Sequence, residues 1–558
     1  MLLARLRSLP VPPVFIVAAV AGLLLWSILP SGVVAFSDDF GYLRSTIETL
    51  QRGRPWTDDW LEPWAASLSV ASALLYRITG SFQFAVHGVQ ILAAAATAAA
   101  AFLLLLHREL SSRRAALVTA LLATSPTLLW QLVDFTSMLV YAPCLLLALW
   151  TAERRQWTWF VLFSLIGLAS RQSALTWTVL PACAAIAAAR NSTTRRPWLA
   201  PTVASLALIG GFLVLAATMN PTHSQSVITA HLFEHLQPAR ASQSFLSGLV
   251  VWSVFTGIGA LVLGWNEIAR PASPLHTTRT LLVVTLGAIV FLLLDTLPPI
   301  FAGHRSFDGS TGALYRHLCI AAGLAGWILF RIRFRWDFAL CALASLSLVS
   351  LRSELWDYYL LDVALLAFFG VIPRSTGTAP EKPSLRPATS IALLVFGILH
   401  FTFAYGIKTQ VDRARAACVL AEHAIRDGRL DVTDLAAAPF GFIGWHLHAH
   451  YKAHDGQHSS DIGGFMRYLR PASAEFRQSP TRFWRDSRSL RPLDDRDASR
   501  VIVSDVFRVG WIWNQRLSLL SSAGDGDIPG PLLFDRTTCQ PRRFPLDDHE
   551  WRTHIAAP

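Results

Sequence analysis

Charged residues are scarce in this sequence. Only 15% of its 558 residues are Asp, Glu, Lys or Arg, whereas 53% are hydrophobic. A soluble globular chain carries about 25% charged residues, so the composition excludes an ordinary soluble enzyme. Apolar stretches of about 20 residues, the length that a helix needs to cross a bilayer, recur between residues 13 and 406. The sequence therefore predicts a polytopic membrane protein.

Cysteine is also rare, with six residues in the chain. Two of them, Cys418 and Cys539, lie in the polar C-terminal part, where a disulfide and two free thiols both stay open. The other four lie inside apolar stretches and are interpreted as small core residues. These four are Cys144, Cys183, Cys319 and Cys341.

No convincing signal-peptide cleavage site follows the N-terminal apolar run, and the run is too long for a signal peptide. We therefore predict that this run is retained as the first helix. The net charge is +11, but arginines beside membrane helices more often set orientation than bind nucleic acid. The expected surroundings are membrane lipids, and no nucleic-acid partner is expected.

We predict a mainly α-helical fold, with about thirteen membrane-spanning helices in residues 1–406. Residues 407–558 are rich in Arg, Asp, His and Pro and have only short apolar runs, which favours a small α/β domain. The predicted spans are 13–36, 83–106, 115–133, 137–151, 156–170, 173–190, 198–218, 244–265, 279–301, 315–332, 336–352, 357–372 and 388–406.

Arginine-rich and arginine-poor loops alternate between these spans. An excess of Lys and Arg marks the cytoplasmic side, so the N-terminus is predicted in the cytoplasm. An odd number of spans then places residues 407–558 outside and makes residues 37–82 a long first external loop. The arginine-rich loops are 107–114, 153–155, 190–196, 270–279, 331–335 and 373–386.

The first external loop begins with two adjacent acids, Asp38 and Asp39, at the predicted edge of the bilayer. After them, apolar residues such as Leu43 and Ile47 fall at helical spacing. The apolar stretch 64–80 is too short to span comfortably. We predict that both segments form helices lying in the plane of the membrane surface.

The acid pair has two interpretations. Ser37 can cap the following helix, and acids in its first turn favour the helix dipole. One acid would suffice for that, however, and adjacent carboxylates repel each other. Two carboxylates at one place suit the activation of a hydroxyl group, because one accepts the proton while the other orients the acceptor or helps to hold a divalent cation. We therefore take Asp38 and Asp39 as candidate catalytic residues.

Other ionisable residues fall at predicted external ends of spans, where they are functional candidates, with capping or a water-filled cavity as the alternative. Asp134 and Asp295 are candidate supporting acids. If the leaving group of a reaction at this surface is a phosphate, the site needs cations as well. A lone external arginine usually snorkels or caps a helix, but several on the face that carries the acids favour anion binding. The candidate cations are Arg171, His304, Arg305, Arg316, His317 and Arg352.

Histidines cluster in the tail between residues 446 and 458. On a strand, His446, His448 and His450 would share one face, as metal ligands can. No fourth ligand is clear, so an exposed polar strand is favoured over a metal site.

The topology of residues 1–406, together with the stretch "SDDFGYL", resembles the GT-C superfamily of integral-membrane glycosyltransferases. Within it, the chain is similar to bacterial relatives of protein O-mannosyltransferases and of the lipid A aminoarabinose transferase. The stretches "ASRQSALTWTVLP" and "LYRHLCIAA" also resemble short elements of these proteins. The W-W-D-Y-G motif of the oligosaccharyltransferase branch does not occur after residue 406.

The resemblance implies a location in the bacterial inner membrane, with residues 407–558 in the periplasm. It also implies transfer of a sugar, with inversion, from a polyprenyl-phosphate donor to an acceptor on the outer face of that membrane. The acceptor is a hydroxyl of an envelope glycan, lipid or protein. By this resemblance Asp38 and Asp39 activate the acceptor, while Arg171, Arg305 and Arg316 neutralise the departing phosphate. The superfamily has metal-dependent and metal-independent members, so the need for a divalent cation stays open.

Two other functions stay open. A lipid-linked sugar flippase, or another transporter without glycosidic chemistry, would carry acids along a path through the middle of the membrane. An assembly partner would use its external domain, where the arginine-rich stretch 476–500 is interpreted either as a docking site for anionic glycans or lipids or as an ordinary solvated surface.

Overall fold

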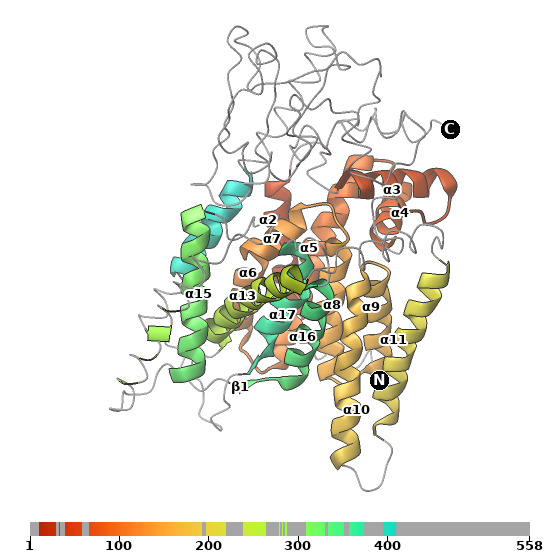
Figure 1. Ribbon diagram of the computed structural model, residues 1–558. Helices are drawn as coiled ribbons and strands as arrows, with labels where there is room; N and C mark the ends of the chain where they lie inside the picture. Colours follow the sequence, from red (N-terminus) through yellow and green to blue (C-terminus); the bar gives the residue numbers. More distant parts are fainter. Residues whose placement is uncertain are drawn as a thin grey trace, which may run out of the picture. The chain divides into compact units, whose positions relative to one another are not determined.

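The structure is a computed structural model of the whole chain (Figure 1). It describes residues 11–29, 33, 39–57, 66–191, 197–218, 238–263, 309–329, 333–350, 357–372 and 394–408, with a few isolated residues between 278 and 289. The predicted span 279–301 and nearly all of the predicted domain 407–558 lie outside these ranges. So do Cys418, Cys539, the histidine cluster of the tail and the stretch 476–500.

The described part of the chain is mainly helical, as predicted, and contains several strongly apolar helices. Three are long and apolar enough to cross a membrane: α5 (Phe82–His107), the helical segment Gln172–Arg190, and α11 (Leu199–Thr218). A fourth is obtained if α6 (Ser112–Ala123) and α7 (Pro126–Val133) count as one span. The number thirteen stays a prediction. The shorter apolar helices are Pro13–Ile28, Met138–Glu153, Trp157–Leu168, Ser244–Ala260, Ala313–Leu324, Trp336–Ser350, Leu361–Gly370 and Leu394–Lys408.

Two predicted spans differ from the observed helices. The first helix, α2 (Val11–Ile28), ends eight residues before the predicted end at residue 36. The predicted span 115–133 is two helices, α6 and α7, bent by 67°. The break has a local cause, because Pro126 has no N–H and disfavours helical backbone at the residue before it. There, the Ser125 hydroxyl donates to the carbonyl oxygen of Leu122 at 2.6 Å.

The chain forms two compact units, which are described separately. The first comprises residues 1–23, 93–131 and 138–404, and the second comprises residues 24–92, 132–137 and 405–558.

The centre of the first unit is α17 (Leu361–Gly370), all ten residues of which are buried. A helix that is apolar on every side belongs inside a bundle. It packs against α13 (Pro238–Leu263) and α16 (Trp336–Ser350), while α8 (Met138–Glu153) packs mainly against α9 (Trp157–Leu168) (Figure 1). After α17 the chain forms the two-residue strand β2 (Val371–Ile372), antiparallel to β1 (Arg333–Phe334).

Helices α13 and α15 (Gly309–Leu329) approach each other closely because both carry glycine at the crossing. A methyl group added at Gly257 would lie 1.7 Å from the carbonyl oxygen of Cys319, and one added at Gly323 would lie 3.1 Å from the Cα of Gly257. Small residues at such crossings let membrane helices pack backbone to backbone.

We expect Gly257→Ala to destabilise the protein by about 2 kcal/mol or more, because the added carbon overlaps a backbone oxygen and the helices have to separate. Gly210→Ala in α11 is the matched control, since nothing lies within 4 Å of its added carbon and alanine favours a helix by up to about 1 kcal/mol. Thermal unfolding in detergent measures both variants. Equal melting temperatures for the two would contradict the crossing.

The second unit contains α3 (Asp39–Arg52) and α4 (Ser67–Thr79), which pack together. These are the two helices predicted for the first external loop, and their existence is confirmed. On α3 the predicted apolar face is buried, with Leu43 at 1% and Ile47 at 4% exposure. Gly80 ends α4 in the left-handed conformation that favours glycine, and its N–H donates to the carbonyl oxygen of Tyr76. The position of both helices at a membrane surface stays a prediction.

Candidate functional site

In the second unit, the segment that carries Asp134 is fixed by hydrogen bonds from two helices. The Tyr42 hydroxyl on α3 donates to the Ser137 hydroxyl at 3.0 Å, and the Gln90 amide on α5 donates to the carbonyl oxygen of Val133 at 2.6 Å. His87 in turn contacts Gln90 at 2.9 Å. Asp134 itself is only 2% exposed, so this segment is packed inside the unit.

The acid pair leads directly into the helix that makes one of these contacts. Asp39 is the first residue of α3, three residues before Tyr42, and Asp38 lies outside the described residues. The structure therefore joins the helix that begins at the acid pair to the segment that follows Asp134.

In the first unit, a buried carboxyl group forms the centre of a second polar cluster. Asp362, near the start of α17, is 2% exposed. Its Oδ2 accepts hydrogen bonds from Tyr141 on α8 at 2.6 Å and from Ser345 on α16 at 2.7 Å. Tyr141 also contacts Ser173 at 2.8 Å, and Ser345 contacts Thr176 at 3.1 Å. We call these residues the Asp362 cluster.

Arg171 is the predicted cation that the structure places next to this cluster. It lies between α9 and the 3-10 helix η1 (Gln172–Thr178), in extended backbone, and is 6% exposed. Its guanidinium carbon lies 4.8 Å from the centre of the Tyr359 ring, and arginine stacks well on aromatic faces. Tyr359 is in the 3-10 helix η3 (Asp357–Leu360), directly before α17.

Two further predicted site residues are described, and they lie outside the Asp362 cluster and the segment that carries Asp134. Arg316 and His317 lie half-buried on α15. The Tyr315 hydroxyl beside them contacts His400 at 3.0 Å, and His400 contacts Thr124 at 3.1 Å. Four predicted residues lie outside the described ranges, so their positions stay predictions. They are Asp295, His304, Arg305 and Arg352.

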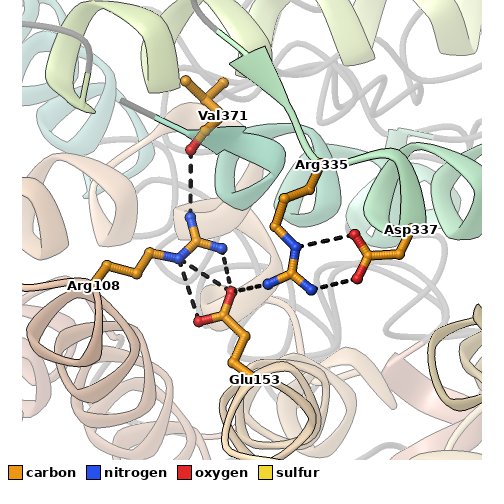
Figure 2. A network of polar contacts seen from close by, with 5 residues as sticks. All are labelled: Arg108, Glu153, Arg335, Asp337 and Val371. Carbon is orange, nitrogen blue, oxygen red and sulfur yellow. Dashed lines mark hydrogen bonds and ion pairs between the residues drawn. The ribbon is translucent and has the colours of Figure 1, made fainter. Parts of the chain in front are cut away.

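A third polar cluster joins loops that the arginine pattern assigns to the cytoplasmic side (Figure 2). One carboxylate oxygen of Glu153 accepts from Arg108 at 2.6 Å and from Arg335 at 2.7 Å. Arg335 also makes a two-point ion pair with Asp337, and Arg108 reaches the carbonyl oxygen of Val371 at 3.5 Å. We call these residues the Glu153 network. It brings together segments from the predicted loops 107–114, 153–155 and 331–335.

Arg335 is held in its charged form by this network. Burial by itself lowers the pKa of its guanidinium, but the hydrogen bond and charge of Asp337 and then the charge of Glu153 outweigh burial, so the pKa is raised. The Arg335 guanidinium therefore stays charged and is not a pH switch.

The Asp362 cluster and the Glu153 network lie toward opposite ends of the same three helices. On α8, Tyr141 and Glu153 are near the two ends, and on α16, Arg335 precedes the helix that carries Ser345. On the third, Asp362 is the second residue of α17, whose ten residues span about 15 Å. This length is about half the thickness of the hydrocarbon core of a bilayer, which is about 30 Å.

The sequence analysis missed Asp362. The available signal was a single acid inside the apolar stretch "YYLLDVALLAFF", since an ionisable residue within a membrane span is a functional candidate by default. Within the described ranges, no group of three or more His, Cys, Asp or Glu side chains could hold a metal ion. Asp38 and Asp295 lie outside those ranges, so a cation at the acid pair stays open.

A scan against models of known protein families gave no match for this chain, and a search of curated proteins gave none either. The function therefore has to be argued from the sequence and from these clusters.

Proposed function

We propose that the protein is a glycosyltransferase of the bacterial inner membrane. It takes a sugar from a polyprenyl-phosphate donor and transfers it, with inversion, to a hydroxyl group of an envelope glycan, lipid or protein on the outer face. The proposal includes about thirteen spans, a cytoplasmic N-terminus and a periplasmic α/β domain in residues 407–558.

The observation that carries the proposal is the fixed start of α3. An acid pair at a membrane surface is useful for catalysis only if the chain around it is rigid, because a general base has to lie within hydrogen-bond reach of the proton that it takes. The Tyr42–Ser137 hydrogen bond anchors the first turn of α3 to the segment that follows Asp134. Asp39, at the start of α3, and the buried Asp134 thus belong to connected elements.

In the proposed reaction, Asp38 or Asp39 accepts the proton of the acceptor hydroxyl as its oxygen attacks the anomeric carbon. The bond between that carbon and the carrier phosphate breaks, and the phosphate leaves with the electron pair. Arg171, with Arg305 and Arg316, would stabilise the negative charge that develops on this phosphate. Asp134 and Asp295 are the proposed supporting acids.

Three features support this assignment without depending on the acid pair. The chain is strongly apolar, as an enzyme with a lipid-linked donor requires. Arg171 is buried and stacked on Tyr359, which gives it a fixed direction for a phosphate oxygen. Arginine-rich loops from distant parts of the sequence meet in the Glu153 network (Figure 2), which agrees with their predicted place on one side of the membrane.

A second candidate function is favoured by one observation. A transporter of lipid-linked sugars would carry an acid near the middle of the membrane. Helix α17, about 15 Å long, separates Asp362 from Val371 beside the Glu153 network. That separation is about half the thickness of the hydrocarbon core. Such a protein would move its substrate across the bilayer without forming a glycosidic bond.

Mass spectrometry of envelope glycans and lipids from cells with and without the protein tests the proposal. We expect one modified envelope component to lose a sugar when the protein is absent, with its polyprenyl-phosphate donor accumulating. Purified protein in vesicles separates the two functions, because the transferase forms a glycosidic product and the transporter only moves the donor. Translocation without such a product would replace the first candidate with the second.

The proposed orientation makes a separate prediction. In a variant without native cysteines, a cysteine at Arg54 is expected to react with a membrane-impermeant thiol reagent in intact spheroplasts. A cysteine at Arg113 is expected to react only after the membrane is opened. Both positions are exposed in the structure, so access depends on the side of the membrane alone. The reverse pattern would place the acid pair in the cytoplasm and remove the proposed reaction.

A further inference from the structure

We infer that Asp362 is a positioning residue for Arg171, and that through this arrangement the protein selects the phosphate headgroup of a lipid carrier over a neutral headgroup. The inference rests on the proposed role of Arg171 in binding the donor phosphate. Asp362 lies outside the predicted site, and its inferred action is to orient Arg171.

The segment around Arg171 is attached at two points to the residues at the start of α17. Arg171 stacks on Tyr359, and Ser173 contacts the Tyr141 hydroxyl at 2.8 Å. That hydroxyl donates to Asp362 at 2.6 Å. Both attachments therefore end within one turn of chain, at positions 359 and 362.

The backbone at Arg171 needs such support because it lies between two helices. Helix α9 ends at Leu168, and η1 begins at Gln172. Arg171 lies in the junction, where its N–H donates to the carbonyl oxygen of Gly167 at 2.8 Å. Side chains at a junction between helices are less constrained than those inside one, so the contacts of Ser173 and Tyr359 help to fix the direction of the guanidinium.

Burial of the Asp362 carboxyl group has a free-energy cost that has to be offset. Burying a carboxyl group in an apolar bundle is costly unless its hydrogen bonds are made, and a leucine at position 362 would pack in α17 without that cost. Hydroxyl groups from α8 and α16 both meet Oδ2 of Asp362. One carboxylate oxygen can accept from two hydroxyl donors, and its negative charge makes both hydrogen bonds shorter and stronger than those to a neutral oxygen.

The ligand class follows from the chemistry of Arg171. A guanidinium held on an aromatic face offers paired N–H donors in one plane, which match the oxygens of a phosphate better than a hydroxyl group. Because Arg171 is 6% exposed within a strongly apolar unit, we assign the phosphate to a lipid carrier and not to a free anion.

The test measures headgroup discrimination by the full-length protein in nanodiscs. Native mass spectrometry gives the apparent affinities for a polyprenyl phosphate and for the matching neutral polyprenol, and inorganic phosphate serves as a competitor. The variants are Asp362→Asn and Tyr141→Phe, and Arg171→Gln reports the loss of the cation itself. Tyr315→Phe is the matched control, because it removes another buried tyrosine hydroxyl of the same unit, one bonded to His400.

We expect the wild-type protein to favour the phosphate, with weak competition from inorganic phosphate. Tyr141→Phe should reduce the ratio of the two affinities by about tenfold, the effect of one or two lost hydrogen bonds. Asp362→Asn should reduce it as well, because the amide oxygen still accepts hydrogen bonds but lacks the charge that strengthens them. Tyr315→Phe should leave it unchanged. A purely structural role would lower both affinities together. A counter-charge without a positioning role would make Asp362→Asn bind the phosphate more tightly.

Either of these last two results overturns the inference, as does a wild-type protein that does not discriminate. Strong competition by inorganic phosphate would reassign the ligand to a free anion. If Asp362→Asn does not fold, Tyr141→Phe carries the test. Failure of the proposed function is distinguishable, because a protein that forms no glycosidic product can still discriminate between headgroups.

Discussion

Replacing both acids of the first external loop, Asp38→Asn with Asp39→Asn, is expected to abolish sugar transfer while the protein still folds. An amide cannot accept the proton of the acceptor hydroxyl, and loss of a general base typically costs about 10²–10⁴-fold in rate. Donor binding should persist, because the proposed phosphate contacts come from arginines elsewhere. Release of labelled sugar from the lipid carrier by purified protein measures the effect.

The chain supplies a matched control for this variant. Asp58 and Asp59 form a second adjacent pair in the same predicted loop, so Asp58→Asn with Asp59→Asn changes the charge equally. We expect this control to retain most of the transfer activity. Full activity in the first variant, or loss confined to the second, would show that the base lies elsewhere. The two single variants, Asp38→Asn and Asp39→Asn, then identify which acid takes the proton.

Much of the helical structure could be predicted because the length of an apolar run sets the length of a helix that is stable in an apolar environment. The predicted spans 83–106 and 198–218 agree closely with α5 and α11. The short helices α3 and α4 were predictable for another reason, since apolar residues on one face of α3 alternate with polar ones.

Positions inside the bundle could not be predicted in the same way. Helix α17 is apolar on every side, so its sequence has no periodicity that distinguishes a lipid-facing helix from a central one. The break between α6 and α7 was missed because the mean apolarity of the stretch 115–133 hides the effect of Pro126 on its neighbours. The backbone preferences at Pro126 and the residue before it determine where the helix breaks. The predicted span depended instead on the mean apolarity of the whole segment.

The polar clusters were even less accessible, because their members are far apart in the sequence. The partners of Asp362 are Tyr141 and Ser345, on two other helices, and a single sequence does not show which helices are neighbours. Arg171 was predicted as a site residue from its place at the end of a span, but the support from Tyr359 and Ser173 depends on packing. In the Glu153 network, arginines interpreted only as orientation signals also have a structural role.

The largest effect on stability is expected for Glu153→Ala. Glu153 is 6% exposed at its side chain and holds Arg108, which is 12% exposed, together with Arg335 (Figure 2). Removing one partner of a buried ion pair leaves an uncompensated charge and typically costs about 3–5 kcal/mol. Arg335 keeps Asp337, so most of the loss arises at Arg108. Thermal unfolding in detergent measures it.

Glu48→Ala is the control for this prediction. Glu48 pairs with Arg52 one turn along α3, with side chains 21% and 41% exposed, and such surface pairs contribute about 0.3–0.5 kcal/mol. We expect a change in stability close to the limit of measurement. A similar small change for Glu153→Ala would mean that water screens the charges of the Glu153 network. The network would then not hold α8 to the segment that follows β1.

A double variant separates the worth of the ion pair from the cost of breaking it. Arg108→Met with Glu153→Leu removes both charges, and replacing a buried pair by apolar residues of similar size is often nearly neutral. The guanidinium carbon of Arg108 lies 5.7 Å from the centre of the Phe338 ring and 5.6 Å from that of the Phe369 ring, so methionine has apolar neighbours at this position. We therefore expect the double variant to be more stable than Glu153→Ala alone. If it is instead less stable, by about the sum of the single losses, the two charges contribute independently and the network is not a coupled unit.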